Sequence, residues 1–299
     1  MRTVAVFLEN LHEMCWGINS QLAYAFVNCF NQIGFKATLV VDANIIRSKH
    51  FDFVFSVAPS HESSYPKKPG TIYIMYQNEQ LPCRDMTTHR ANLVWRRCRQ
   101  DILKYDVVFD VSKDNIEFLR MRGKKAFYFE LGYHPLFNVK KQEVEKKYDV
   151  AFVGNIIGEN SRREYILDGL RNFCETSGFS YNFCPTIVGD EYYQLMFSSK
   201  IFLNIHQTYI RFFESQKIVQ TGFSNGVFLL SEPFARMERY KNDQHISVRP
   251  IAHFEQAIQH FLTHPKEREC IASQGHQFVQ KFLLVDSLRT TLDRAGITC

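Results

Sequence analysis

Signatures of several common enzyme classes are missing from this 299-residue sequence. It contains no G-x-S-x-G elbow, no H-E-x-x-H segment and no Walker P-loop, which disfavours serine hydrolases, zincin metalloproteases and P-loop nucleotidases. An Asp-x-Asp pair, the usual carboxylate pair for a metal–diphosphate complex, is also lacking. The sequence therefore predicts no metal ligands, and leaving-group charge must then be neutralised by helix N-termini and by Arg or Lys.

Long apolar runs and paired cysteines are lacking as well. No run approaches 18 apolar residues, and the first one, residues 3–8, stops at Glu9, which is too short for a signal peptide. The eight cysteines form no C-x-x-C pair and mostly lie in apolar stretches, as buried free thiols do in reducing compartments. We therefore expect a cytoplasmic protein without a transmembrane segment.

The composition is that of a globular chain, with 45% hydrophobic and 22% charged residues. The net charge of +5 fits an enzyme whose substrates carry phosphates, but it is too small to identify a nucleic-acid binder.

Short apolar runs alternate with helical patterns along the chain, which is the βαβ rhythm of a doubly wound sheet. The predicted strands are residues 3–8, 37–41, 51–57, 71–76, 106–111, 126–131, 149–153, 179–184, 200–205 and 227–231. The predicted helices are residues 21–32, 90–104, 113–121, 162–176, 214–223 and 253–262.

A lysine-rich stretch interrupts this rhythm once, which favours two α/β domains over one large sheet. We predict two Rossmann-like doubly wound parallel-sheet domains that face a cleft. The predicted parts are an acceptor domain at 1–139, a linker at 140–147, a donor domain at 148–284 and a C-terminal helix at 285–299 that packs back on the first domain. Ligands of such sheets bind beyond the carboxyl ends of the strands, so the loops at those ends are the candidate sites.

A polar loop follows the predicted strand at 200–205 and leads into the predicted helix at 214–223. The first N–H groups of a helix lack intrahelical acceptors and can bind an anion, and Arg211 and Lys217 can add charge-assisted hydrogen bonds to a diphosphate. From the local pattern alone, Arg211 as a surface residue and His206 as a buried structural histidine stay open. The candidate donor-binding residues here are His206, Gln207, Thr208, Tyr209, Arg211, Glu214 and Lys217.

A second candidate loop begins with Gly154 and Asn155 after the predicted strand at 149–153, and Arg162 and Arg163 open the next helix. Gly154 allows the backbone to turn tightly and approach a ligand. Cations at a helix start oppose the helix dipole, which favours a role other than local stability for the two arginines. These four residues join the candidate donor-binding set.

Two polar loops in the first half could carry the acceptor chemistry. Glu79 follows the predicted strand at 71–76, and His12 and Glu13 follow the strand at 3–8; each can take a proton from an acceptor hydroxyl. An ordinary solvated loop is an equal interpretation of both segments. The candidate acceptor-binding residues are Trp16, Gly17, Asn19, Gln77 and Asn78.

Several segments together resemble GT-B glycosyltransferases of the group-1-like and spore-maturation-protein-like kind. Residues 199–206 resemble their strand entering the donor site, and residues 214–218 followed by 226–232 resemble their helix–glycine–strand donor motif. Residues 264–275 are similar to their C-terminal tail helix. In the first half, a similar series is formed by residues 76–81, 105–112 and 131–135 with Asn115 and Gly123.

The resemblance implies a GT-B fold with a nucleotide sugar in the second domain and an acceptor against the first. It makes Glu214 and Glu232 candidates for ribose contact. Two departures from the family pattern are visible. Gln220 and Thr221 occupy the helix region where relatives carry a Glu, and Lys217 stands where they often carry Arg, whose bidentate fork Lys cannot reproduce.

These observations predict a metal-independent glycosyltransferase that moves a sugar from a nucleotide-diphosphate donor, its substrate, to an acceptor hydroxyl, with no cofactor. On the resemblance, the acceptor is a glycan or its lipid-linked precursor. Two alternatives stay open: a glycosyltransferase acting on a modified DNA base, and a noncatalytic nucleotide-sugar-binding protein. If the reaction inverts configuration, Glu79, His12 or Glu13 is the base; the sequence does not decide between inversion and retention.

Overall fold

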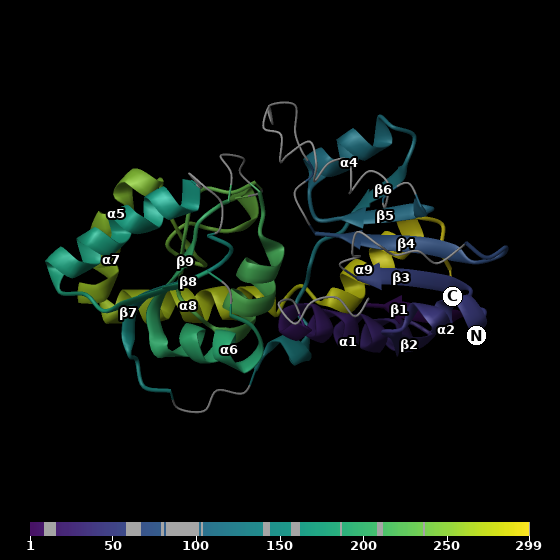
Figure 1. The fold of residues 1–299 in the computed structure, drawn as a ribbon, viewed down its shortest axis with the longest axis horizontal. Helices are drawn as coiled ribbons and strands as arrows, with labels where there is room; N and C mark the ends of the chain where they lie inside the picture. The colour runs from purple at the N-terminus through teal and green to yellow at the C-terminus, as the bar shows by residue number, and fades with distance from the viewer. Residues whose placement is uncertain are drawn as a thin grey trace. The chain divides into compact units, whose positions relative to one another are not determined.

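The computed structural model describes residues 1–8, 16–57, 67–78, 81, 102, 104–139, 144–156, 162–185, 187–207, 212–235 and 237–298. The chain divides into two compact units, which are described separately (Figure 1). Unit 1 consists of Met1–Gly132 and Leu283–Cys299, and unit 2 consists of Tyr133–Phe282. The chain therefore leaves unit 1, builds the whole of unit 2 and returns to unit 1.

Unit 1 contains a six-stranded, fully parallel sheet in the order β2-β1-β3-β4-β5-β6, which runs from bottom to top in Figure 1. The order reverses at β1, so the topological switch point lies between β1 and β3. The strands are β1 (Thr3–Phe7), β2 (Lys36–Val40), β3 (Phe53–Val57), β4 (Ile72–Gln77), β5 (Val107–Asp110) and β6 (Lys125–Tyr128).

Both faces of this sheet are covered by apolar side chains, as expected for parallel strands. One face packs in a core with Ile46, Ile116 and Leu119 from the helices, and the other holds an aromatic cluster that includes Phe26 and Phe109. Among its described residues, the helices of unit 1 are α1 (Trp16–Gln32), α2 (Ala43–Ser48), α4 (Lys113–Arg120) and α9 (Leu284–Arg294).

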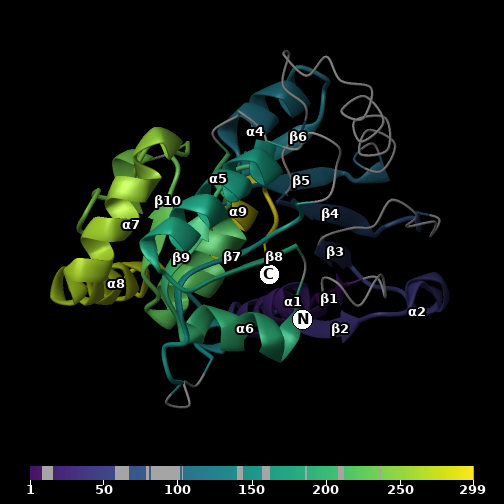
Figure 2. The ribbon, with the colours of Figure 1, turned by 60° about the vertical axis from the view of Figure 1, so that its left-hand side comes forward.

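Unit 2 contains a five-stranded parallel sheet in the order β11-β10-β9-β7-β8, and its switch point lies between β7 and β9. Its strands are β7 (Tyr148–Val153), β8 (Tyr181–Cys184), β9 (Ser199–Asn204), β10 (Leu229–Ser231) and β11 (Ser247–Val248). Figure 2 shows the helices around this sheet. They are α5 (Arg162–Ser177), α6 (Gly189–Ser198), α7 (Phe254–Thr263) and α8 (Pro265–Val279).

The prediction of two doubly wound parallel sheets is confirmed, and all ten predicted strands are present, with every end within three residues of its predicted position. The sequence missed β11, α2 and α6. The predicted helix at 214–223 differs in kind: Gln216–Gly222 form a π-helical turn, η3, followed by a 3-10 turn, η4 (Phe223–Asn225). Most of the predicted helix at 90–104 lies outside the described residues.

None of the helices in the described residues combines the length and hydropathy that a bilayer span requires.

Helix α9 closes unit 1 although it lies at the far end of the sequence. Its Leu284, Leu288 and Leu292 recur at a spacing of four residues and are almost completely buried. The helix packs against α1 and β6. Unit 1 therefore needs its last segment to complete its core.

We expect Leu288→Ala to lower the free energy of unfolding of unit 1 by about 2–5 kcal/mol, because it removes a fully buried side chain and leaves a cavity. Urea unfolding followed by circular dichroism measures the change. The neighbouring Arg289→Ala is the control: its side chain is half exposed, and its ion pair with Asp286 contributes at most about 1 kcal/mol. Equal effects of the two substitutions would contradict the packing of α9.

Candidate functional site

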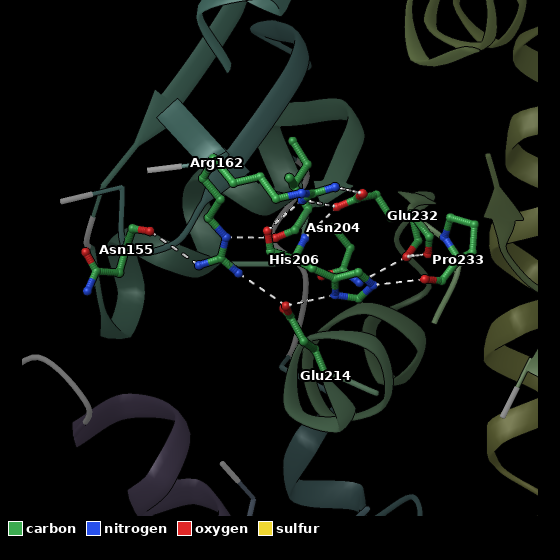
Figure 3. Close-up of polar contacts among 10 residues, drawn as sticks. Asn155, Arg162, Asn204, His206, Glu214, Glu232 and Pro233 are labelled. Carbon is green, nitrogen blue, oxygen red and sulfur yellow. Dashed lines mark hydrogen bonds and ion pairs between the residues drawn. The ribbon is translucent and has the colours of Figure 1, made fainter. Parts of the chain in front are cut away.

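The carboxyl ends of β7, β9 and β10 bring together most of the candidate donor-binding residues of unit 2. Gly154 and Asn155 follow β7, His206 and Gln207 follow β9, and Glu232 follows β10. Since β7 and β9 flank the switch point, these loops lie where doubly wound sheets bind ligands. Figure 3 shows Asn155, His206 and Glu232 close together at this edge.

Arg163, in the first turn of α5, is buried and ties three separate segments together. Its Nε donates to the carbonyl of Ile205 at 2.8 Å, and its Nη1 donates to the carbonyl of Asn155 at 3.3 Å. Its Nη2 pairs with Glu214 Oε1 at 3.2 Å. Burial lowers the pKa of Arg163, and the charge of Glu214 opposes that shift. All three guanidinium nitrogens are therefore engaged in holding the loops after β7 and β9.

Gly154 makes room for this guanidinium. A Cβ atom at Gly154 would lie 2.9 Å from Phe152 Cζ and 3.3 Å from Arg163 Nη1. A side chain at this position would therefore push against both the phenyl ring and the arginine. The glycine serves close packing here.

Arg162 joins the loops after β9 and β10. Its Nη1 donates to the carbonyl of His206 and to Glu232 Oε2, both at 2.9 Å, and its Nη2 pairs with the other carboxylate oxygen of Glu232. The backbone N–H of His206 also donates to Glu232 Oε2 at 2.7 Å (Figure 3). This bidentate pair is a charge-assisted arrangement that fixes both partners in one orientation.

The imidazole of His206 lies between two acceptors. Its Nδ1 is 3.3 Å from Glu214 Oε1, and its Nε2 is 3.2 Å from the carbonyl oxygen of Pro233 (Figure 3). A carbonyl and an ionised carboxylate only accept, so both hydrogen bonds form together only when both ring nitrogens carry protons. The ring thereby links the segment around Glu214 to the loop after β10.

Glu214 is a fixed, ionised carboxylate. Burial alone would raise its pKa, but the hydrogen bond from His206 and the charges of Lys217 and Arg163 outweigh burial and lower the pKa to about 2. Its side chain keeps 21% of its surface exposed.

Lys217 is the least satisfied of the described cations of the site. Its Nζ lies 4.4 Å from the ring centre of Phe152 and 5.9 Å from that of Phe202. Among the described residues, no carboxylate or carbonyl oxygen lies within hydrogen-bond or ion-pair distance of this ammonium. Burial lowers its pKa to about 7, Glu214 opposes the shift and Arg163 adds to it. A half-buried cation over aromatic faces is a suitable partner for an incoming anion.

In unit 1, the candidate acceptor residues lie at the carboxyl ends of β1 and β4. Gly17 and Asn19 are half-buried in the first turn of α1, Gln77 is buried at the last position of β4, and Asn78 is half-buried after it. These elements belong to one edge of the sheet of unit 1.

A buried polar pair next to Gln77 was given no role by the sequence. Asp110, the last residue of β5, stands opposite Gln77 in register. Both of its oxygens accept from Asn115 Nδ2 at 3.1 Å, and Asn115 Oδ1 accepts the backbone N–H of Leu81 at 3.2 Å. Burial raises the pKa of Asp110 well above its ordinary value, although the Ser112 N–H and Asn115 oppose this. The pair anchors the chain beyond β4.

Several candidates fall outside the described part of the chain. These are the predicted bases His12, Glu13 and Glu79 and the predicted donor ligands Thr208, Tyr209 and Arg211; of Trp16, only the backbone is described. Within the described residues, no three His, Cys, Asp or Glu side chains are grouped so as to hold a metal ion.

Sequence reasoning missed Phe152 and Asn204. Phe152 supplies the aromatic face under Lys217, but it reads as an ordinary buried strand residue. Asn204 ends β9, is fully buried and donates through Nδ2 to Ser231 Oγ at 3.0 Å, which fastens β9 to β10. A polar residue that closes an apolar run is the signal that would have found Asn204.

We expect Arg163→Met to lower the free energy of unfolding of unit 2 by about 3 kcal/mol, because it leaves the Glu214 carboxylate and two carbonyls without their donor. Denaturant unfolding measures the loss. Arg171→Met on the same helix is the matched control, since its pair with Asp168 is partly exposed and is expected to contribute under about 1 kcal/mol. A loss below 1 kcal/mol for Arg163→Met would contradict the role of Arg163 in holding these segments together.

Lys217 generates a pH dependence of stability. Its pKa is about 7 in the folded chain and about 10 when unfolded, so the unfolded state binds more protons between these values. The free energy of unfolding is therefore expected to rise with pH across this window. Lys217→Met is expected to lack that rise and to be more stable than the native protein at pH 6.5.

Urea unfolding at pH 6.5, 8 and 9.5 checks this expectation, with the exposed Lys281→Met as control, which should keep the native pH dependence. A difference between Lys217→Met and the native protein that stays constant over the three pH values would contradict the depressed pKa.

Comparison with known proteins gives one family and a set of similar folds. Residues 141–289 match the family model described as glycosyl transferase-like. No curated protein sequence matches the chain.

The solved structures similar to this one include HepE from Anabaena in complex with UDP-glucose, with a TM-score of 0.62, 10% identity and coverage of 99% of this chain and 100% of HepE. Sucrose-phosphate synthase from Thermosynechococcus elongatus has a TM-score of 0.61, 9% identity and 99% coverage of both chains. An alpha-glucosyltransferase in complex with UDP and a 13-mer DNA containing an HMU base has a TM-score of 0.62, 11% identity and 98% coverage of both chains.

At these identities the similarity is one of fold, and it extends over both units. The sequence prediction of a GT-B fold is confirmed. Residues 141–289 form a glycosyl transferase-like domain by their family match, and the chain is a glycosyltransferase of the GT-B type.

Proposed function

We propose that the protein takes a sugar from a nucleoside-diphosphate donor held at the switch point of unit 2 and transfers it to an acceptor hydroxyl without a metal ion. The observation that carries the proposal is the ammonium of Lys217. It lies near the loops after β7 and β9, over Phe152 and Phe202, and has no oxygen partner within the described residues. A diphosphate would supply that partner.

The fixed charges around Lys217 support this assignment. Arg163 and Arg162 are each engaged with a carboxylate and with backbone carbonyls, so they hold the loops in place. A preorganised cation is more effective than a mobile one, because it needs no reorganisation when negative charge develops on the leaving diphosphate. In this proposal Lys217 contacts the diphosphate, the start of the segment 215–225 faces it, and Arg211 adds a second cation.

Glu214 is the proposed acceptor of hydroxyl groups from the donor. It is ionised, partly exposed and held by His206 and Arg163, so its orientation is set before a ligand arrives. A charged carboxylate accepts stronger hydrogen bonds than a neutral group. Glu232 is engaged by Arg162 and the His206 N–H, which favours a role in shaping the loop over direct ribose contact.

For the acceptor we propose a glycan or its lipid-linked precursor, used in the cytoplasm. Gln77 and Asn78 would lie against it, and Glu79, His12 or Glu13 would take its proton if the reaction inverts configuration. A modified base in DNA is the second candidate, since an alpha-glucosyltransferase of similar fold was solved with such a DNA. Duplex binding that weakens steeply as salt rises would favour this second acceptor.

The donor assignment is tested by thermal unfolding with UDP, GDP, CDP, ADP and their sugar conjugates in the presence of EDTA. A ligand that binds only the folded state raises the unfolding midpoint as its concentration rises. We expect one nucleotide series to stabilise the protein with EDTA present, and Lys217→Met to weaken its binding about 10- to 100-fold.

Lys200→Met is the matched control, because Lys200 pairs with Asp149 at the opposite end of β9 and should leave nucleotide affinity unchanged. Two outcomes contradict the proposal: no nucleotide stabilises the protein, or Lys217→Met and Lys200→Met weaken binding equally. If the stabilisation by a nucleotide disappears when EDTA is added, only the proposed metal independence is contradicted, and the proposed nucleotide binding stands.

A further inference from the structure

A pocket of about 280 Å³ lies at the amino end of strands β9 and β10, within unit 2. Ser199, the first residue of β9, lines it together with Val227 and Phe228, which directly precede β10. Helix α8 contributes Arg268 and Ala272. The volume is close to the lower limit for pockets that hold small organic ligands.

This pocket is separate from the candidate site at the carboxyl ends of the strands. Ser199 begins β9 and Asn204 ends it, so the strand spans about 17 Å between the pocket and the loop that holds His206. A diphosphate held by the loops after β7 and β9 would not reach the pocket. The proposed donor binding therefore gives the pocket no role.

Arg268 is a buried cation of the pocket, with 8% of its surface exposed. Its Nη1 donates to the carbonyl of Phe261 at 2.7 Å, and its Nη2 lies 3.9 Å from Glu269 Oε1, beyond hydrogen-bond distance. Within the described part of the chain, the Phe261 carbonyl is the one hydrogen-bond acceptor that the guanidinium meets. A guanidinium carries five N–H donors, so most of them find no acceptor among these residues.

The stability of α8 does not explain this cation. Arg268 lies in the first turn of the helix, where a positive charge opposes the helix dipole. Burial lowers the pKa of Arg268, and the charges of Glu269 and Asp149 oppose that shift. Asp149 is itself paired with Lys200 at 2.7 Å, and the side chain of Glu269 is 75% exposed. Arg268 is thus a desolvated cation that a bound anion would stabilise.

Two lysines of the pocket lining are held in place by oxygen atoms of the protein. Lys146 Nζ donates to the carbonyls of Phe197 and Ser199, both at 2.8 Å. Lys200 Nζ donates to Asp149 Oδ1 at 2.7 Å. These contacts fix the polar part of the lining before a ligand arrives, which reduces the entropy cost of binding.

Apolar side chains supply the rest of the surface that a ligand would contact. They are Val144, Phe197, Val227, Phe228 and Ala272. Phe197, Val227 and Phe228 are each more than nine-tenths buried. A ligand that fills the pocket therefore has to combine an apolar part with an anionic group for Arg268.

We propose that this pocket binds a small organic carboxylate, whose charged end meets Arg268 and whose apolar tail lies against Phe197, Val227 and Phe228. The two oxygens of a carboxylate accept two N–H groups of a guanidinium at once. The single negative charge suits a pocket that already has Glu269 in its lining. The tail is favoured because the pocket removes its apolar surface from water.

The test is isothermal titration calorimetry of the full chain with octanoate, octanol and inorganic phosphate. We expect octanoate to bind at least about 10-fold more tightly than octanol, because the alcohol cannot form charge-assisted hydrogen bonds with Arg268. Phosphate, which has no apolar part, is expected to bind more weakly than octanoate. Arg268→Met is expected to reduce octanoate affinity to that of octanol, and Lys217→Met is expected to leave it unchanged.

Glu269→Gln tests the pocket without removing a buried group. The Glu269 carboxylate competes with the ligand for the guanidinium, so this variant is expected to bind octanoate about 2- to 5-fold more tightly. Glu267→Gln is the matched control, because Glu267 lies on the same helix but pairs with His260 outside the pocket, and its affinity should stay unchanged. Ala272→Phe fills the pocket and is expected to weaken octanoate and octanol alike.

Absence of octanoate binding, or equal affinities for octanoate and octanol, would overturn the proposal. Equal effects of Glu269→Gln and Glu267→Gln would overturn it as well, even if Arg268→Met fails to fold. Tighter binding of phosphate than of octanoate would assign the pocket to an inorganic anion and contradict the apolar tail.

Discussion

The candidate site of unit 2 depends on one buried guanidinium. Arg163 holds the carbonyls of Ile205 and Asn155 and the carboxylate of Glu214, which belong to three segments far apart in sequence. A buried charge of this kind is tolerated only when its hydrogen bonds are made. Because they are, the loops after β7 and β9 keep a fixed spacing, and Glu214 and His206 keep their orientation. The arrangement of the other residues of the site follows from these hydrogen bonds of Arg163.

The position of Arg163 also affects the pKa of Lys217. The positive charge of Arg163 and the apolar rings beneath Lys217 both disfavour a second cation, while Glu214 favours it. The outcome is an ammonium whose pKa is lowered to about 7. Placing it there costs stability at neutral pH; in the proposed function this cost prepares the site for an anion, which is a common relation between stability and function.

Much of the fold was readable from the sequence because buried parallel strands appear as continuous apolar runs. Strands such as β7 and β9 were found in this way, and their ends predicted which loops meet. The two-residue strand β11 has no such run, and it was missed. The π-helical turn was also missed, because its hydrogen-bond register is set by packing: Gly222 lies against Leu229, and Thr221 meets the Tyr192 hydroxyl at 3.1 Å.

The candidate site was predictable as a set of loops but not as a set of contacts. The sequence placed Arg162 and Arg163 at a helix start, and the unfavourable dipole there indicated a further role. It could not show that Arg162 meets Glu232, 70 positions away, since that pairing depends on how β9 and β10 are stacked in the sheet. The pairing of Asp110 with Asn115 was hidden for another reason, because one residue ends a strand and the other lies in the next helix, and neither signals the contact by itself.

The chain crosses between the units twice, after Gly132 and after Phe282, and the two crossings are joined where the Tyr133 N–H donates to the carbonyl of Phe282 at 2.7 Å. During synthesis on the ribosome, unit 2 is therefore complete before α9 has emerged. Until α9 is synthesised, the surface of residues 1–132 that α9 covers in the folded protein stays exposed to water. Vectorial translation thus favours the second unit as the earlier to mature, the reverse of the usual N-terminal-first order.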